Sequence, residues 1–198
     1  MSACRRRTFL RLATAAVLGG RCAAAAAQTP TVSLAEAARR LGQRGHVLMM
    51  RHALTEAGIG DPSHFRLDDC STQRNLSAAG REQARATGAA LRAQGVRIDE
   101  VRSSAWCRCR DTAQLAFGEH SVWPALNSFF QDDAGGLAQT RAVLDLARQS
   151  GNSANLMLVT HQVNITAACG EFASAGEIVA CRWRDGRLTA EFRFRASV

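Results

Sequence analysis

The stretch His46-Val47-Leu48-Met49-Met50-Arg51-His52-Ala53 decides the fold of this chain. Its four consecutive apolar residues, 47–50, predict a short strand that is buried on both faces, as in a parallel sheet. Arg51 and His52 follow at the end of that strand. Neighbouring side chains on a strand point to opposite faces, so both can serve one site only where the strand ends. Ligands of open α/β sheets bind at such ends, although this stretch alone is equally compatible with the start of a solvated loop.

A second apolar run repeats the pattern later in the chain. Leu156-Met157-Leu158-Val159 predicts another strand buried on both faces, and it leads into Thr160-His161. Parallel strands end at the same edge of a sheet. We therefore expect His52 and His161 to converge at that edge.

Helical and strand patterns alternate through the rest of the chain and then close on two strands. Helices are predicted over 33–42, 77–94, 105–117, 137–149 and 163–168, and strands over 46–50, 98–104, 156–159, 177–183 and 188–194. The Asp185-Gly186 dipeptide predicts a tight hairpin between the last two strands. The expected fold is a three-layer α/β/α sandwich with a mostly parallel central sheet and a C-terminal antiparallel hairpin. Residues 54–75 form a long loop that leaves the first strand end and could wall a pocket.

The N-terminal residues 1–27 have the pattern of an export signal. Arginines are followed by an apolar stretch, 12–20, and by small residues that suit cleavage before Gln28. Arg6-Arg7 in this leader resembles a twin-arginine signal, and a general secretory signal is the alternative. The apolar stretch is too short for a retained membrane anchor. We expect a periplasmic or secreted protein, with residues 28–198 as one domain.

The charge of the chain does not favour a nucleic-acid partner. The formal net charge of the 198 residues is +8, but five of the 25 basic residues lie in the leader, which has no acidic residue. The remainder holds 20 arginines against 17 acidic residues, a net charge of +3. Nucleic-acid binding requires basic residues clustered on one face.

Five cysteines follow the leader: Cys70, Cys107, Cys109, Cys169 and Cys181. In an oxidising compartment some should pair, and an odd number leaves at least one free. A bridge between Cys169 and Cys181 is one expectation, and buried free thiols are the alternative. Cys107-x-Cys109 is interpreted as structural or paired elsewhere rather than as a metal site.

A third cationic motif follows the strand 98–104. It reads Ser103-Ser104-Ala105-Trp106-Cys107-Arg108-Cys109-Arg110-Asp111-Thr112-Ala113 and covers a strand-to-helix turn, where helix N-termini favour anions. Arg108 and Thr112 share one helix face. Arg110 is about 200° away around the helix and should point elsewhere.

These residues resemble the histidine phosphatase (phosphoglycerate mutase-like) superfamily. The resemblance rests on 51–53, 103–113 and 159–161, and on the run 74–84 with its Leu-Ser-x-x-Gly-x-x-Gln-Ala pattern, all in the family's order. It implies that His52 is a nucleophile that forms a phosphohistidine, which water then hydrolyses. It also implies that Arg51, Arg108 and His161 hold the phosphoryl oxygens. Arginine suits this role because its planar fork matches phosphate oxygens, and the chemistry requires no metal or cofactor.

The proton donor for the leaving group is less well marked. Gln162 stands where some members of the family have an Asp, and the spacing of other members points to Asp132, or else Asp133. Glu56 is a third candidate. Ala53, where Gly is common in the family, and Gly58, where mutases have a polar contact, disfavour a glycolytic mutase, as does the leader.

The expected function is therefore an exported phosphatase that hydrolyses small phosphate monoesters through phospho-His52. A non-catalytic phosphate-ligand binder is the alternative, as is a phosphatase specific for phosphohistidine or lipopolysaccharide phosphate. The remaining arginines and histidines considered are interpreted as surface or structural residues: Arg66, Arg74, Arg110, His46, His64 and His120.

Overall fold

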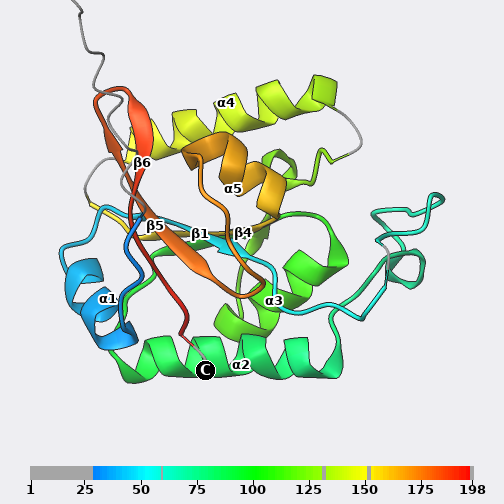
Figure 1. Cartoon of the computed structure of the whole chain (residues 1–198), viewed down its shortest axis with the longest axis horizontal. Helices are drawn as coiled ribbons and strands as arrows, with labels where there is room; N and C mark the ends of the chain where they lie inside the picture. The colour runs from blue at the N-terminus through cyan, green and yellow to red at the C-terminus, as the bar shows by residue number, and fades with distance from the viewer. Residues whose placement is uncertain (1–28, 59, 131–132, 151–152, 197–198) are drawn as a thin grey trace, which may run out of the picture.

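A computed structural model describes residues 29–58, 60–130, 133–150 and 153–196. The predicted leader and Asp132 lie outside these residues. The described chain forms one six-stranded sheet in the order β3-β2-β4-β1-β5-β6. Helices α4 and α5 cover one face of the sheet, and α1, α2 and α3 cover the other (Figure 1). The predicted three-layer α/β/α sandwich is confirmed.

The sheet is parallel in its first half and antiparallel in its second. The strands β1 (Val47–Arg51), β2 (Glu100–Ser103), β3 (Ser121–Val122) and β4 (Leu156–Thr160) are parallel neighbours. The hairpin of β5 (Ile178–Arg184) and β6 (Arg187–Phe194) adds to β1 in the antiparallel sense. Its turn has positive φ at Asp185 and Gly186, 50° and 76°, as the predicted two-residue turn requires.

Alternation along the two central strands divides the apolar residues between two cores. Leu48 and Met157 pack under α1, α2 and α3, whereas Met49 and Leu158 pack under α4 and α5. Both faces of β1 and β4 are therefore buried, which is why these strands have no polar residue until they end. The residues that follow the strands emerge at one edge of the sheet.

The helices begin and end close to the predicted positions. They are α1 (Leu34–Leu41), α2 (Ala78–Ala93), α3 (Cys107–Phe117), α4 (Asp133–Ser150) and α5 (Gln162–Cys169). Ser33 and Ser77 cap α1 and α2, each accepting a backbone N–H three residues on. Helix α4 begins four residues earlier than predicted, and the short strand β3 was not predicted. No helix in the described ranges is both long and apolar enough to span a membrane.

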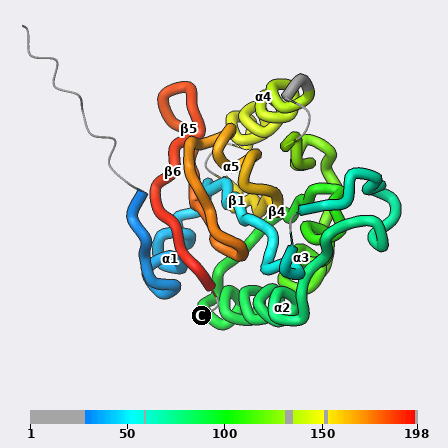
Figure 2. The backbone as a smooth tube through the Cα atoms, turned by 45° about the vertical axis from the view of Figure 1, so that its right-hand side comes forward, coloured from blue at the N-terminus to red at the C-terminus, as the bar shows by residue number. Residues whose placement is uncertain are grey.

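The long loop 54–75 projects from the body of the molecule on the side of α3 (Figures 1 and 2). Its two ends pair with each other, since Glu56 N donates to Asn75 O and Ser77 N donates to Leu54 O. The loop is also joined to α3 by a disulfide between Cys70 and Cys107, whose Cα atoms are 5.7 Å apart. The expected bridge between Cys169 and Cys181 is wrong for this structure, where both are free thiols. Cys70 lies in a loop without periodicity, so its approach to the start of α3 left no signal in the pattern.

Candidate active site

The ends of β1 and β4 lie side by side, as the two apolar runs predicted. The backbone N–H of His52 donates to Thr160 O at 3.0 Å, and the ring centroids of His52 and His161 are 5.5 Å apart. Ser104 N donates to Val159 O, which brings the turn before α3 to the same edge. Three segments far apart in sequence therefore meet around the two imidazoles.

A cavity of about 490 Å³ opens at this edge. Its polar lining includes the predicted quartet of Arg51, His52, Arg108 and His161. The aromatic side chains of Phe65, Trp106 and Phe130 form part of its wall, and the full lining also includes Gly60, Asp61, Arg74, Ser128, Gln162 and Val163. The loop 54–75 supplies four of these residues, so the expectation that it walls a pocket is confirmed.

His52 is held as a neutral imidazole with a free Nε2. Its Nδ1 lies 2.8 Å from the carbonyl oxygen of Ala53. Because a carbonyl only accepts, Nδ1 carries the proton and Nε2 keeps its lone pair. Burial first, and then the nearby positive charge of Arg108, lower the pKa of His52 to about 3. The ring is therefore unprotonated at neutral pH, as a nucleophile must be.

His161 is neutral for the same reason, because burial lowers its pKa well below the ordinary value. Its Nδ1 faces the guanidinium of Arg108, with Nη2 at 3.5 Å. Guanidinium only donates, so Nδ1 accepts and the ring proton lies on Nε2, 3.0 Å from Ser104 Oγ. Ser104 Oγ in turn donates to Asn127 Oδ1 at 3.0 Å.

Arg108 is positioned by the first turn of α3. Its guanidinium lies 4.3 Å above the ring of Trp106, in a cation–π contact. One turn on, Thr112 Oγ1 donates to Arg108 O at 2.7 Å and accepts from Ala53 N at 3.0 Å. This shared face links the helix to the strand exit just after His52. Arg110, as predicted, points away and is exposed.

The cavity has unpaired cationic donors. Arg51, Arg74 and Arg108 each have a buried Nε with no hydrogen-bond partner among the described residues. The three guanidinium groups lie close enough together for Arg74 and Arg108 to lower the pKa of Arg51, after burial. An unpaired buried donor is costly unless a ligand binds it. The arrangement therefore fits a multiply charged anion.

Asp61 is the one carboxylate among the described residues that line the cavity. Its Oδ1 accepts from Arg108 Nη1 and from the backbone N–H of Arg74, both at 2.9 Å. With both histidines neutral, three arginines and one carboxylate leave the lining with a net charge of +2. A phosphate monoester carries about the opposite charge.

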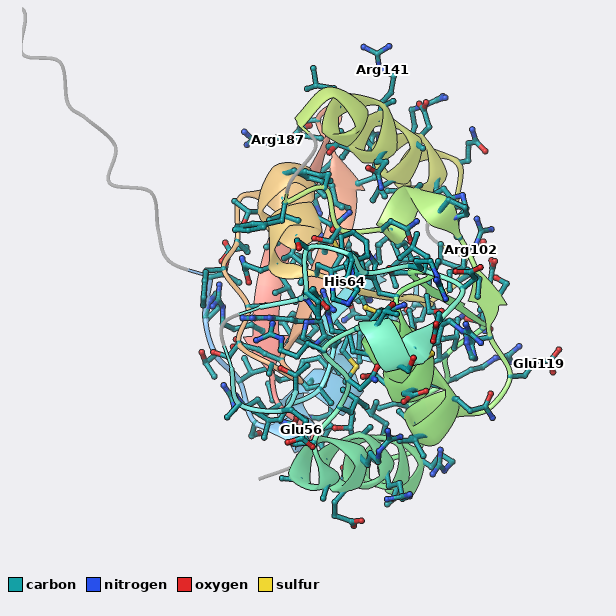
Figure 3. The ribbon with its side chains drawn as sticks, turned by 90° about the vertical axis from the view of Figure 1, so that its right-hand side faces the viewer. Glu56, His64, Arg102, Glu119, Arg141 and Arg187 are labelled. Carbon is teal, nitrogen blue, oxygen red and sulfur yellow. A yellow bond between two sulfur atoms is a disulfide. The ribbon has the colours of Figure 1, made fainter. Side chains whose placement is uncertain are left out.

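The predicted proton donors are not in the described cavity. Asp132 lies outside the described residues, as does the side chain of Asp133, so both stay predictions. Glu56 is exposed and lies beside α2 (Figure 3), and it is not among the residues that line the cavity. The described residues do not support Glu56 as the donor.

Most of the arginines and histidines interpreted as surface or structural residues lie outside the cavity. Arg66 is exposed and pairs with Asp69, and His64 is exposed on the loop (Figure 3). His46 is buried directly before β1, 3.3 Å from a Glu191 oxygen. His120 is half-buried and outside the cavity.

The interpretation of Arg74 as a surface or structural residue is wrong, because Arg74 lines the cavity. Arg74 and Asp61 were missed because the loop 54–75 has no periodicity. One signal was present: Arg74 lies three residues before Ser77, the cap of α2. The motif Leu76-Ser77-x-x-Gly80-x-x-Gln83 holds this start of α2 against the strand exit. Gln83 accepts from Leu54 N at 3.0 Å, and a Cβ at Gly80 would lie 1.8 Å from Leu54 O.

The described part of the chain offers no candidate metal site. The described residues contain no group of three His, Cys, Asp or Glu side chains that could hold a metal ion. Cys107 is in the disulfide, and burial raises the pKa of the free Cys109 thiol to about 12.

The chain is similar to a known protein family in sequence and to several solved structures in fold. The sequence profile of the histidine phosphatase superfamily (branch 1) matches residues 47–138. The chain matches none of the curated protein sequences compared with it.

Among solved structures, the fold is similar to that of the protein histidine phosphatase SixA complexed with tungstate, with a TM-score of 0.53, 17% identity, and coverage of 76% of this chain and 97% of that one. A putative alpha-ribazole-5'-P phosphatase from Escherichia coli has a TM-score of 0.57, 17% identity, and coverage of 77% and 97%. A mutant phosphoserine phosphatase from Entamoeba histolytica in complex with phosphoserine has a TM-score of 0.55, 15% identity, and coverage of 75% and 95%.

Proposed function

The chain belongs to the histidine phosphatase superfamily, and from that premise we propose that it hydrolyses phosphate monoesters through a phosphohistidine on His52. The observation that carries the proposal is the cluster of three arginines with unpaired buried Nε atoms around a neutral histidine. The three arginines would bind the phosphoryl group. The aromatic side chains of the lining, Phe65, Trp106 and Phe130, would contact the organic part of the substrate. The neighbours named above, two of them phosphatases of small phosphorylated molecules, support a small substrate.

Each residue of the quartet has a role in this proposal. The Nε2 lone pair of His52 attacks phosphorus, and Arg51 and Arg108 donate to the phosphoryl oxygens, where charge develops in the transition state. His161 contributes a neutral N–H. A phosphoryl oxygen beside Nδ1 would select the tautomer with the proton on Nδ1, and the Ser104 hydroxyl would then turn from Asn127 Oδ1 to donate to Nε2 of His161.

The test is hydrolysis of a generic aryl phosphate by the purified protein, beside His52→Ala. We expect wild-type turnover, an acid-labile phosphoryl group on His52 trapped by rapid quench, and loss of both in the variant. The control is His64→Ala, which removes an exposed histidine from the loop and should leave turnover unchanged. Equal hydrolysis by wild type and His52→Ala would reject the nucleophile.

The non-catalytic alternative makes a different prediction. A binder would take up inorganic phosphate or tungstate at this cavity and would turn over no ester, phosphohistidine peptide or phosphorylated lipopolysaccharide. Including those three substrate classes in the panel also separates the specific phosphatases from a general one.

We further propose that the protein works in the periplasm or outside the cell. The leader pattern of residues 1–27 supports this, and so does the disulfide between Cys70 and Cys107, because such bonds persist in oxidising compartments. Fusing residues 1–27 to a reporter that reports on export, with Arg6 and Arg7 changed to Lys as the comparison, tests the location and the route.

A further inference from the structure

We propose that Asp61 is the general acid that protonates the leaving oxygen, an inference that rests on the proposed phosphatase function. Cleavage of an unactivated ester expels an alkoxide or phenoxide, which needs a proton in the transition state. Among the described residues that line the cavity, Asp61 is the one carboxylate. Arg51, Arg74 and Arg108 cannot supply that proton, because guanidinium stays protonated.

The geometry places Asp61 beside the phosphoryl site. Its carboxylate binds Nη1 of Arg108 at 2.9 Å, and that same guanidinium has an unpaired buried Nε. A phosphoryl group held by Arg108 is therefore a direct neighbour of Asp61. The side chain of Asp61 is 13% exposed and comes from the projecting loop, whereas His52 is 4% exposed at the strand end.

In-line displacement then gives the two residues opposite positions. The leaving oxygen departs on the side of phosphorus opposite to Nε2 of His52. His52 is buried at the strand end, whereas Gly60, Asp61 and Phe65 line the cavity from the loop 54–75. In the proposed reaction His52 attacks from the strand end, and the leaving oxygen would depart toward this loop and its Asp61 carboxyl.

Substrate binding also supplies the reason for Asp61 to hold a proton. In the free protein Arg108 pairs with the carboxylate. A phosphate dianion would take the Arg108 donors and leave Asp61 next to a second negative charge, which favours the protonated carboxyl. The phosphoryl group thus first displaces Asp61 from Arg108, and Asp61 then donates its proton to the leaving oxygen.

The two half-reactions balance with Asp61 as acid and then base. In the first, Nε2 of His52 forms a bond to phosphorus, the ester P–O bond breaks, and the Asp61 proton moves to the leaving oxygen to give an alcohol. In the second, water attacks phosphorus and gives a proton to the Asp61 carboxylate, while the Nε2–P bond breaks. Inorganic phosphate, neutral His52 and protonated Asp61 result.

The test compares leaving groups in Asp61→Asn. We expect kcat/KM on phenyl phosphate, which reports phosphoryl transfer to His52, to fall about 100-fold, in the range of general acid catalysis. On dinitrophenyl phosphate, whose leaving group needs no proton, kcat/KM should fall less than about 3-fold. Inorganic phosphate should inhibit the variant more strongly than the wild type, because the competing carboxylate is gone. Asp61→Glu keeps a carboxyl group and should recover part of the phenyl phosphate activity.

Three comparisons make the result decisive. Asp68→Asn removes a carboxylate that is exposed on the same loop and should leave both rates unchanged. An equal loss on both substrates in a folded Asp61→Asn protein would overturn the inference, as would selective loss on phenyl phosphate in Asp132→Asn instead. If the wild type hydrolyses no ester and His52 takes no phosphoryl group, the phosphatase proposal fails and this inference with it.

Discussion

The Nδ1 atom of His52 donates to the carbonyl oxygen of its own chain neighbour Ala53, at 2.8 Å. This contact selects one tautomer without using a second side chain. It depends on the strand ending at this point, because a carbonyl in a continuing parallel ladder would bind the next strand. The break that lets Arg51 and His52 share a site also orients the nucleophile.

The first prediction concerns the protonation state of that ring. With its pKa lowered to about 3 by burial first and then by Arg108, His52 should stay neutral, with the proton on Nδ1, from pH 8 down to about pH 4. Nitrogen-15 NMR of histidine-labelled protein, with the resonance assigned by its loss in His52→Gln, measures this directly. A His52 ring that takes a proton near pH 6.5 would contradict it.

The second prediction follows from the same shift through linkage. The unfolded chain binds protons at His52 near pH 6.5, whereas the folded chain binds them only near pH 3. The contribution of His52 to the free energy of unfolding should therefore be fully present above pH 6.5 and should be lost as the pH falls toward 3. His52 should contribute a slope of about 1.4 kcal/mol per pH unit in this window. Urea unfolding at several pH values should show a shallower slope for His52→Gln, and an unchanged slope would be evidence against the shift.

The third prediction concerns Arg74. Its buried, unpaired Nε lies in the cationic lining, so Arg74→Ala should lower kcat/KM about 10- to 100-fold through loss of charge-assisted hydrogen bonds to the substrate. Arg66→Ala is the matched control, because Arg66 lies on the same loop but is exposed and paired with Asp69. Steady-state kinetics on an aryl phosphate measures both. Equal effects of Arg74→Ala and Arg66→Ala on kcat/KM would show that Arg74 does not bind the substrate.

The fold followed from the sequence where local pattern and tertiary structure agree. The runs 47–50 and 156–159 had to be central strands because no exposed face could accept them, and Asp185-Gly186 fixed the hairpin register. The histidines at both strand ends then followed from topology, since parallel strands finish at one edge. Capping by Ser33 and Ser77 is equally local.

The loop 54–75 was not predictable in the same way. Its conformation comes from side chains that bind backbone atoms: Gln73 accepts from Cys107 N of α3, and Asn75 Nδ2 donates to Cys70 O within the loop. Such contacts have no periodic signature, so neither the disulfide partner of Cys107 nor the positions of Asp61 and Arg74 could be derived from spacing. The part of the site that the sequence predicted is the part made by strands and helix starts.

The fourth prediction tests how closely α2 must approach α3. A Cβ at Gly88 would lie 1.9 Å from Ala116 O, a backbone atom that cannot turn aside. Gly88→Ala should therefore force the helices apart and destabilise the protein by about 1–3 kcal/mol, and it should weaken phosphate binding because α3 carries Arg108. Ala89→Ser changes the next residue, which is exposed, and should have neither effect. Thermal unfolding and phosphate titration measure the two, and a Gly88→Ala protein as stable as wild type would contradict the close packing.

The last prediction concerns the disulfide that joins the loop to α3. Cys70 and Cys107 are 37 residues apart in sequence, and closing a loop of that length stabilises the folded chain by about 4 kcal/mol in the chain-entropy description. Replacing both with Ser should lower the free energy of unfolding by about that amount and raise KM, because Asp61, Phe65 and Arg74 reach the cavity from this loop. Reduction of the wild type should reproduce both effects. Cys169→Ser, which removes a free thiol, serves as the control. A thiol assay that finds Cys70 and Cys107 both free in protein purified under oxidising conditions would refute the bridge, and an unchanged KM in the double variant would show that the loop holds its position without it.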